Sequence, residues 1–399
     1  MPRVLFAMLL LFLTALPLSA DPYYPSASKA SRLATLDSFW AQWKATYLRE
    51  GCGGAYVDIA GDGKATWGGS ASNTLTVSEA HGYGMLALVQ MAPRDRSARR
   101  LFDGFVRFYN LHPAASDPGL MAWNQTRDCQ DAPDGGDASA TDGDLDIALA
   151  LLRADQRWGG YGAAARKAQT AILAQDVSDD NMMRLGDWAV DGAYGHSSRA
   201  SDFMPASFAA FAAAGGSDAR RWRAIRDRGY SVWTDLSRRY AGQTGLVPDF
   251  LVQLPDHPRP AKAHFLEGAD DGRFSWNALR FPWRLSLDYL ETGDPRARAH
   301  LQRINGWIQG ATRGDPQRIA NTYRLNGRGV GRAGKGSAAF IAMFAASAVA
   351  GSGKPEADQA WSDALWQALN AVPLEDADYY GNTLKLLAMI ALAEQGPHR

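Results

Sequence analysis

The sequence predicts an all-α protein, an (α/α)6 barrel with long loops at one end. Three observations support this fold class. Apolar residues recur at helical spacing in twelve segments, alternating strand patterns are scarce, and long Gly-, Pro- and Asp-rich stretches fall mostly between alternate helices. Antiparallel helix pairs arranged in a ring gather such loops at one end, and twelve helices make six pairs. Long loops in a compact helical domain usually carry function, so we expect the site there.

Each predicted element rests on this periodicity. In one segment four apolar residues form an i, i+3, i+4, i+7 stripe, namely Leu145, Ala148, Leu149 and Leu152. The predicted helices span residues 31–48, 78–92, 96–111, 142–157, 160–175, 203–214, 217–239, 275–291, 294–311, 334–349, 355–371 and 378–395. The best strand candidates are 55–59 and 245–251. The long loops are 50–77, 112–141, 176–202, 241–274 and 312–333.

The composition is that of one large globular domain. The chain has 399 residues, of which 46% are hydrophobic and 11% aromatic, so it can bury a large core. The formal net charge is zero, which gives no reason to expect nucleic acid or an anionic membrane as a partner. Thirteen tryptophans suit a sugar-binding groove, but large cores use them too. We expect a monomer.

Residues 1–20 read as a secretory signal peptide, with one early arginine, an apolar run and the small pair Ser19-Ala20 at its end. We expect cleavage after Ala20, a mature domain over 21–399 and a periplasmic or secreted protein without stable membrane association. An uncleaved anchor is the alternative. Only Cys52 and Cys129 are present. In an oxidising compartment they either form a bridge or stay as two buried thiols.

Carboxylates stand at the starts of two predicted core helices. Asp142, Asp144 and Asp146 lie directly before the apolar stripe, and Glu79 opens the helix of SEAHGYGM. Two such carboxylates are what acid/base cleavage of a glycosidic bond needs. Helix capping is the plain alternative. Ser78 would then cap the first helix, with Glu79 favoured by the helix dipole, and Asp142 or Thr141 would cap the second.

The stretch ATDGDLDIALALLRADQRW at 140–158 resembles the signature of glycoside hydrolase family 8, which reads A-S/T-D-A/G-D, two spacers, I-A and a closing aromatic. The resemblance implies an (α/α)6 barrel with Glu79 as general acid. It also implies that Asp142 holds the distorted sugar and helps to place the water. Asp144 and Asp146 are then structural. A calcium loop is the alternative for DGDLD, although its later ligands are absent.

The second catalytic carboxylate departs from the commonest family pattern. Many members place an aspartate base in a stretch resembling Y-D-A-x-R-x-P-W-R, and here residues 276–284 read WNALRFPWR, with Asn277 at that position. An amide cannot take a proton from water as a carboxylate does. In one branch of the family the position is also Asn, and a glutamate on an inserted loop some ten residues earlier serves as base. Glu267 stands ten residues before Asn277, so we predict it as the base, with Asp270 and Asp271 as weaker candidates.

Aromatic and polar residues near these motifs are the candidates for substrate contacts. Core packing is as good an explanation for each aromatic one. The candidates are Trp123, Tyr83, Phe203, Trp276, Asn277, Arg280 and Tyr380. For Arg280 we expect contact with sugar hydroxyls or with a carboxylate, and a surface salt bridge is the alternative. No paired-His spacing indicates a metal, and we expect no cofactor.

We therefore predict an inverting endo-β-glucanase that hydrolyses β-1,4 bonds in cellulose-type or mixed-linkage β-glucan. A chitosanase of the same family is the first alternative, because six aspartates could line an acidic groove: Asp128, Asp131, Asp134, Asp137, Asp270 and Asp271. A glycan-binding protein that has lost catalysis is the second, motivated by Asn277.

Overall fold

The computed structural model describes residues 21–61, 73–330, 337–376 and 378–393. The signal-peptide prediction for 1–20 lies outside these residues, as do the first residues of the predicted helix 334–349 and the last two of 378–395. Twelve α-helices occur within the described residues: α1 (Lys29–Tyr47), α2 (Ser78–Met91), α3 (Ala98–Leu111), α4 (Thr141–Trp158), α5 (Gly162–Gln175), α6 (Pro205–Ala213), α7 (Ala219–Tyr240), α8 (Arg280–Thr292), α9 (Pro295–Thr312), α10 (Ala338–Ser347), α11 (Pro355–Ala371) and α12 (Tyr379–Ala393). None of them is long and apolar enough to cross a bilayer.

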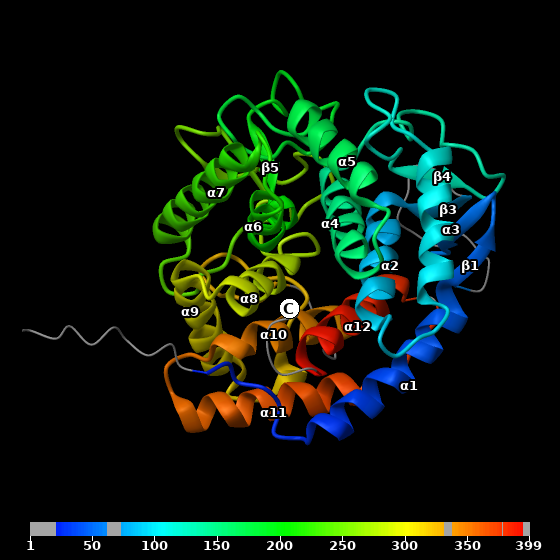
Figure 1. Ribbon diagram of the computed structural model, residues 1–399. Coiled ribbons are helices and arrows are strands. Elements are labelled where there is room, and N and C mark those ends of the chain that lie inside the picture. The colour runs from blue at the N-terminus through cyan, green and yellow to red at the C-terminus, as the bar shows by residue number, and fades with distance from the viewer. Residues whose placement is uncertain (1–20, 62–72, 331–336, 377, 394–399) are drawn as a thin grey trace, which may run out of the picture.

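The helices form two concentric rings (Figure 1). The even-numbered helices pack side by side in the order α2, α4, α6, α8, α10, α12, and α12 returns to α2. Each odd-numbered helix packs against an inner neighbour from outside, as α1 does on α12 and α3 on α2. This is the (α/α)6 barrel that the sequence predicts, and it places the start of every inner helix at the same end.

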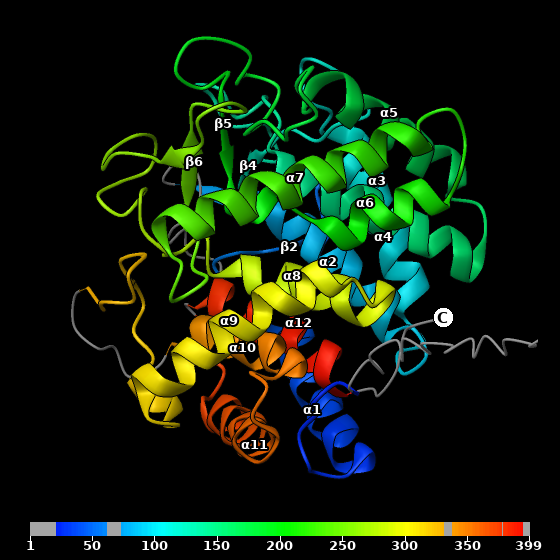
Figure 2. The ribbon, with the colours of Figure 1, turned by 90° about the vertical axis from the view of Figure 1, so that its left-hand side faces the viewer.

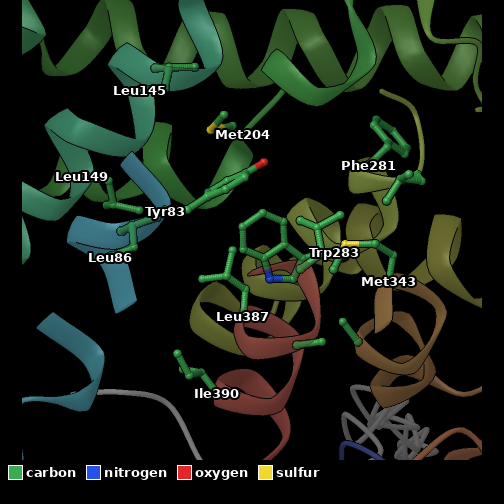
Figure 3. Packing of buried hydrophobic residues seen from close by; sticks show 14 of the residues in the cluster. Tyr83, Leu86, Leu145, Leu149, Met204, Phe281, Trp283, Met343, Leu387 and Ile390 are labelled. Carbon is green, nitrogen blue, oxygen red and sulfur yellow. The ribbon is translucent and has the colours of Figure 1, made fainter. Parts of the chain in front are cut away.

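Two of the inner helices, α10 and α12, are apolar over most of their surface because they are covered on almost every side. All ten residues of α10 are buried, and α12 is buried over almost its whole length. Side chains of the inner helices meet in the middle of the barrel, where Tyr83 of α2, Trp283 of α8 and Leu387 of α12 lie close together (Figure 3). The Tyr83 and Trp283 rings cross edge to face at 6.1 Å.

Short antiparallel strands organise the loops at one side of the barrel (Figure 2). They form two two-stranded sheets and one three-stranded sheet: β1 (Leu48–Gly51) with β2 (Gly54–Val57), β3 (Thr74–Val77) with β4 (Asn124–Thr126), and β5 (Ser197–Arg199) with β6 (Phe250–Val252) and β7 (Arg259–Pro260). The predicted strand 55–59 is confirmed in its first half. The prediction for 245–251 is wrong over 245–249, where Gly245 takes a positive φ and the chain is irregular before β6.

A disulfide joins Cys52 and Cys129, with their Cα atoms 5.4 Å apart. It links the turn between β1 and β2 to the turn after β4, across 77 residues of sequence. Of the two alternatives that the sequence leaves open, the bridge is therefore the correct one. It fastens the loop that leads from Trp123 to the start of α4.

Candidate active site

Close packing of α2 on α4 brings Glu79 and Asp142 together. A Cβ on Gly143 would stand 2.3 Å from the Oγ of Ser78, and one on Gly82 would stand 2.7 Å from the Cβ of Asp146. Real Cβ atoms do not approach so closely, so both glycines are needed for this helix spacing. The backbone N–H of Ser78 donates to the carbonyl of Trp123 at 2.9 Å, which fixes the start of α2.

The three aspartates of α4 point to three different partners. Asp142 faces Arg280, Asp144 accepts a hydrogen bond from the backbone of Met121 at 2.9 Å, and Asp146 binds Arg284. They do not converge as calcium ligands would. Within the described ranges no group of three His, Cys, Asp or Glu side chains is arranged to hold a metal ion. The capping alternative also fails for Asp142 and Thr141, because α4 begins without a side-chain cap.

A buried ion pair ties α4 to α8 beneath the site. Both guanidinium Nη atoms of Arg284 bind both carboxylate oxygens of Asp146, at 2.7 and 2.6 Å, and neither side chain is more than 2% exposed. Losing one partner of such a pair leaves an uncompensated buried charge and costs about 3–5 kcal/mol. Its role is therefore to fix the two helices that carry Asp142 and Arg280.

Arg280 is the centre of the site and is only 2% exposed. Its Nη1 donates to Glu79 Oε2 at 2.5 Å, to Asp142 Oδ2 at 2.8 Å and to the hydroxyl of Tyr83 at 3.1 Å. Its Nη2 donates to Asn277 Oδ1 at 2.8 Å. Of the roles that we expect for Arg280, contact with a carboxylate is the one that the structure has, and the surface salt bridge is wrong.

Glu267 joins this network from the loop after β7. Its Oε2 accepts a hydrogen bond from Asn277 Nδ2 at 2.7 Å, and its Oε1 lies 3.9 Å from Nη2 of Arg199. The Nη1 of Arg199 lies 3.4 Å from Asp142 Oδ2, so the contacts lead back to the Asp142 carboxylate that Arg280 also binds. We call these five residues the polar ring: Asp142, Arg199, Glu267, Asn277 and Arg280. Glu79 is attached to the ring through Arg280.

The charges of the polar ring explain which carboxyl is protonated. Two arginines balance the carboxylates of Asp142 and Glu267, so an ionised Glu79 would add an unbalanced negative charge. Burial, assisted by the nearby Asp142 carboxylate, raises the pKa of Glu79 to about 7 although Arg280 opposes the shift. Burial also works to raise the pKa of Asp142, but Arg199 and Arg280 outweigh it and lower that pKa to about 2. Two neighbouring carboxyls are thus held in opposite states, as acid/base chemistry requires.

The loop that carries Glu267 is held from within by Asp271. The carboxylate of Asp271 is 3% exposed and accepts hydrogen bonds from three successive backbone N–H groups, those of Leu266, Glu267 and Gly268, at 2.7, 3.1 and 2.8 Å. Asp270 binds Arg273 instead. Neither weaker candidate for the base is therefore free to act as one. Glu267 itself is 50% exposed and open to water.

Asp249 fixes the approach to α8 in the same way. Its Oδ1 accepts from the backbone N–H groups of Ser275, Asn277 and Ala278 at 2.9, 3.2 and 2.7 Å. These bonds shape 275–279 as a turn, which is why α8 begins at Arg280 and not at the predicted 275.

Two of the predicted aromatic candidates for substrate contacts, Tyr83 and Phe203, are buried and do not face solvent. Trp276 is 42% exposed, and its carbonyl accepts a hydrogen bond from the Tyr380 hydroxyl at 2.8 Å. Trp123 is partly buried beside the start of α2. Tyr83 is fully buried behind Arg280, so it forms a wall and does not reach substrate.

Phe203 is the second buried candidate, and its prediction as a substrate contact is wrong. It packs in the core against Tyr230 and Phe281, with ring centroids 5.2 and 6.1 Å away, and is 3% exposed. The chain enters α6 only at Pro205, later than predicted. Phe203 therefore precedes the helix, and its side chain points into the core.

Sequence reasoning missed Arg199, Asp249 and Tyr379. The hydroxyl of Tyr379 donates to Glu79 Oε1 at 3.3 Å. None of the three belongs to a recognisable motif. A count of charge was the available signal, because the carboxyl groups of Glu79, Asp142, Asp146 and Glu267 outnumber the two arginines of WNALRFPWR.

An (α/α)6 barrel that carries a buried carboxyl of raised pKa at the start of an inner helix, and an exposed carboxyl on a loop beside it, has the groups that a glycoside hydrolase needs. Comparison with known proteins agrees. The sequence profile described as Glycosyl hydrolases family 8 matches residues 24–394, and the chain belongs to this family.

Individual relatives cover almost the whole chain. A protein named Beta-glucanase from Niallia circulans is 41% identical, over 89% of this chain and 83% of the relative. A protein named Endoglucanase from Bacillus sp. strain KSM-330 is 30% identical, over 92% of this chain and 77% of its own. The solved apo structure of a beta-1,3-1,4-glucanase from Paenibacillus sp. X4 superposes with a TM-score of 0.85 at 38% identity, covering 94% and 95% of the two chains.

Proposed function

We propose that this protein is an inverting endo-β-glucanase that hydrolyses β-1,4 bonds in cellulose-type or mixed-linkage β-glucan. The observation that carries the proposal is the polar ring. It connects Glu79, whose pKa burial raises to about 7, with the partly exposed Glu267 through Arg280 and Asn277.

In this mechanism Glu79 donates its proton to the glycosidic oxygen as the bond to the anomeric carbon breaks. Glu267 takes a proton from a water that attacks the same carbon from the opposite face. After cleavage Glu79 is ionised and Glu267 is protonated, and proton exchange with water restores both before the next turnover. The ionised Asp142 stabilises the positive charge that develops on the sugar. Asn277 orients Glu267 by its hydrogen bond, a role that needs no charge.

A neutral polymer suits this site better than chitosan. Of the six aspartates that could form an acidic groove, three are engaged elsewhere: Asp131 pairs with His112, Asp270 with Arg273, and Asp271 with its own loop. The two arginines of the polar ring lie beside the cleavage point and would repel a glucosamine ammonium group. The relatives named Beta-glucanase, Endoglucanase and beta-1,3-1,4-glucanase also favour a glucan substrate.

The test is a panel of carboxymethylcellulose, barley β-glucan, xylan and chitosan with product analysis. We expect internal cleavage of one or both glucans, little action on xylan and none on chitosan. The Glu79→Gln protein, prepared in the same way, is the matched control, because the proposed mechanism predicts that it loses at least ~10²-fold in rate on every polymer that the wild type cleaves. Preferential cleavage of chitosan would establish the chitosanase alternative. Binding of glucan without cleavage of any polymer would establish the binding-only alternative.

We also propose that the protein is exported, because residues 1–20 have the pattern of a cleaved signal peptide. A disulfide between the chain's two cysteines is consistent with an oxidising compartment. N-terminal sequencing of the native protein should start at Asp21, and recovery of the intact Met1 terminus from the cytoplasm would contradict export.

A further inference from the structure

The structure contains an arginine that neither the motifs nor the proposed mechanism uses. Arg199 ends β5 and its side chain is 12% exposed. Its guanidinium lies between two carboxylates, with Asp142 Oδ2 at 3.4 Å from Nη1 and Glu267 Oε1 at 3.9 Å from Nη2. The guanidinium carbon stands 5.6 Å from the centroid of the Phe250 ring on the neighbouring strand. Strand pairing and ring contact thus hold the cation in a fixed place.

The contacts of Arg199 are electrostatic more than structural. The distance to Glu267 is too long for a hydrogen bond, so what Arg199 supplies there is charge. The loop of Glu267 does not need Arg199 for its shape, because Asp271 already binds three of its backbone N–H groups. The start of α4 is held independently by the Asp146–Arg284 pair.

We propose that Arg199 is a positioning residue for the hydrolytic reaction, whose fixed positive charge between Asp142 and Glu267 keeps the Glu267 carboxylate aimed at the attacking water. This inference rests on the proposed function, in which Glu79 is the acid and Glu267 the base.

The groups that face Arg199 come from four elements. Asp142 approaches from α4, Glu267 from its loop, Asp202 from the 3-10 turn after β5 (Ala200–Asp202), and Arg280 from α8. Asp202 is fully buried, and its Oδ2 has no hydrogen-bond partner within the described part of the chain. Removing the Arg199 charge therefore leaves three acidic groups facing a single remaining guanidinium.

The consequence is a displaced pH profile. Arg199 and Arg280 both lower the pKa of Glu79 against the effect of burial, while the hydroxyl of Tyr379 contributes a hydrogen bond. Without Arg199 that pKa rises, so the alkaline limb of kcat/KM moves to higher pH. The acid limb is followed in the same profile.

The experiment compares kcat/KM against pH on barley β-glucan for the wild type and for Arg199→Gln, Arg199→Met and Arg199→Lys. For both uncharged variants we expect the alkaline limb to move upward by about 1 pH unit or more, and kcat at neutral pH to fall at least ~10-fold. Arg199→Lys should return the alkaline limb close to its wild-type position, because it restores the charge without the fork of two Nη groups.

Arg226→Gln is the matched control. Arg226 is similarly buried, at 16% exposure, and it also bridges two carboxylates, Asp288 and Asp294, at 2.8 Å each. Those carboxylates lie outside the polar ring. Its loss should lower the melting temperature and leave both limbs where they are, which separates loss of stability from loss of the site's charge.

Two outcomes distinguish failure of this inference from failure of the proposed function. If a folded uncharged variant at position 199 keeps both limbs in place while Glu79→Gln and Glu267→Ala are inactive, Arg199 has no such role and the mechanism stands. If Glu79→Gln and Glu267→Ala keep wild-type activity, the assignment of acid and base is itself wrong, and the inference about Arg199 falls with it.

Discussion

The side-chain amide of Asn277 donates a hydrogen bond to Glu267 and accepts one from Arg280, at 2.7 and 2.8 Å. The amide nitrogen Nδ2 is the donor to Glu267, and the amide oxygen Oδ1 is the acceptor from Arg280. An aspartate at this position could accept from Arg280 but could not donate to Glu267 unless it were protonated. Asn277 is thus suited to a site whose base stands on the neighbouring loop.

The first prediction concerns this amide. Asn277→Asp should lower activity and not raise it, because two carboxylates in contact compete for one proton and perturb each other's pKa. In the Glu267→Ala background the same substitution should restore part of the activity, since it rebuilds the commoner family arrangement. Initial rates of the single and double variants on β-glucan measure this. Higher activity of Asn277→Asp in the wild-type background would contradict the role given to Glu267.

The second prediction concerns the acid. Glu79→Gln should reduce polysaccharide cleavage by at least ~10²-fold and leave the fold intact. In the wild type the active form carries the proton on Glu79, whose pKa is about 7, so activity should fall as the pH rises through that region. Circular dichroism and a pH–rate profile measure the two effects. Near-normal turnover by a folded Glu79→Gln protein would remove Glu79 from the mechanism.

The third prediction concerns the base. Glu267→Ala should be almost inactive on every substrate, because the attacking water loses its proton acceptor while Asp271 still holds the loop. Azide, an anion that needs no activation, should restore part of the turnover and yield a glycosyl azide of inverted configuration. Substantial activity of Glu267→Ala without azide would show that the base lies elsewhere.

The fourth prediction concerns stereochemistry. A single displacement by water inverts the anomeric carbon, so the first product released from a β-linked glucan should be the α-anomer. Proton NMR at early times, before mutarotation, distinguishes the two anomers. An initial β-anomer would require a covalent intermediate and would rule out the mechanism proposed here.

The fifth prediction concerns stability. Replacing both Cys52 and Cys129 by serine should lower the free energy of unfolding by about 2–5 kcal/mol, since the bridge closes a long loop of the unfolded chain. Chemical denaturation measures the loss. Reduction of the wild type should lower the free energy of unfolding by a similar amount. As the control, the same reducing agent should leave the stability of the Cys52→Ser/Cys129→Ser protein unchanged.

The helices could be predicted from the sequence because each follows from its own local periodicity. The errors lie where a tertiary contact decides the local structure. The turn at 275–279 exists because Asp249, more than twenty residues earlier, binds its backbone N–H groups. The core position of Phe203 depends on its contact with Tyr230, which local periodicity does not encode.

The same distinction applies to the site. Glu79 and Asp142 stand in long motifs, and the structure brings both onto Arg280. Glu267 could be chosen over its neighbours only by resemblance. The structure adds that Glu267 contacts Asn277, whereas Asp270 and Asp271 are bound elsewhere. Arg199 could not be found by either route, because its position depends on how β5 pairs with β6.

The Glu267 loop is shaped by hydrogen bonds to the carboxylate of its own residue Asp271. The base of the loop is joined to the sheet at Phe250, whose backbone bonds Asp271 and Ala261, so the hydrogen bonds that shape the loop come from the loop itself and from this sheet. A family member with aspartate at the Asn277 position should therefore accept this loop as a graft, together with Asp→Asn at the entry to its own α8. Under the proposed assignment of the base, exchange of this one segment moves the catalytic carboxylate between two places in one barrel.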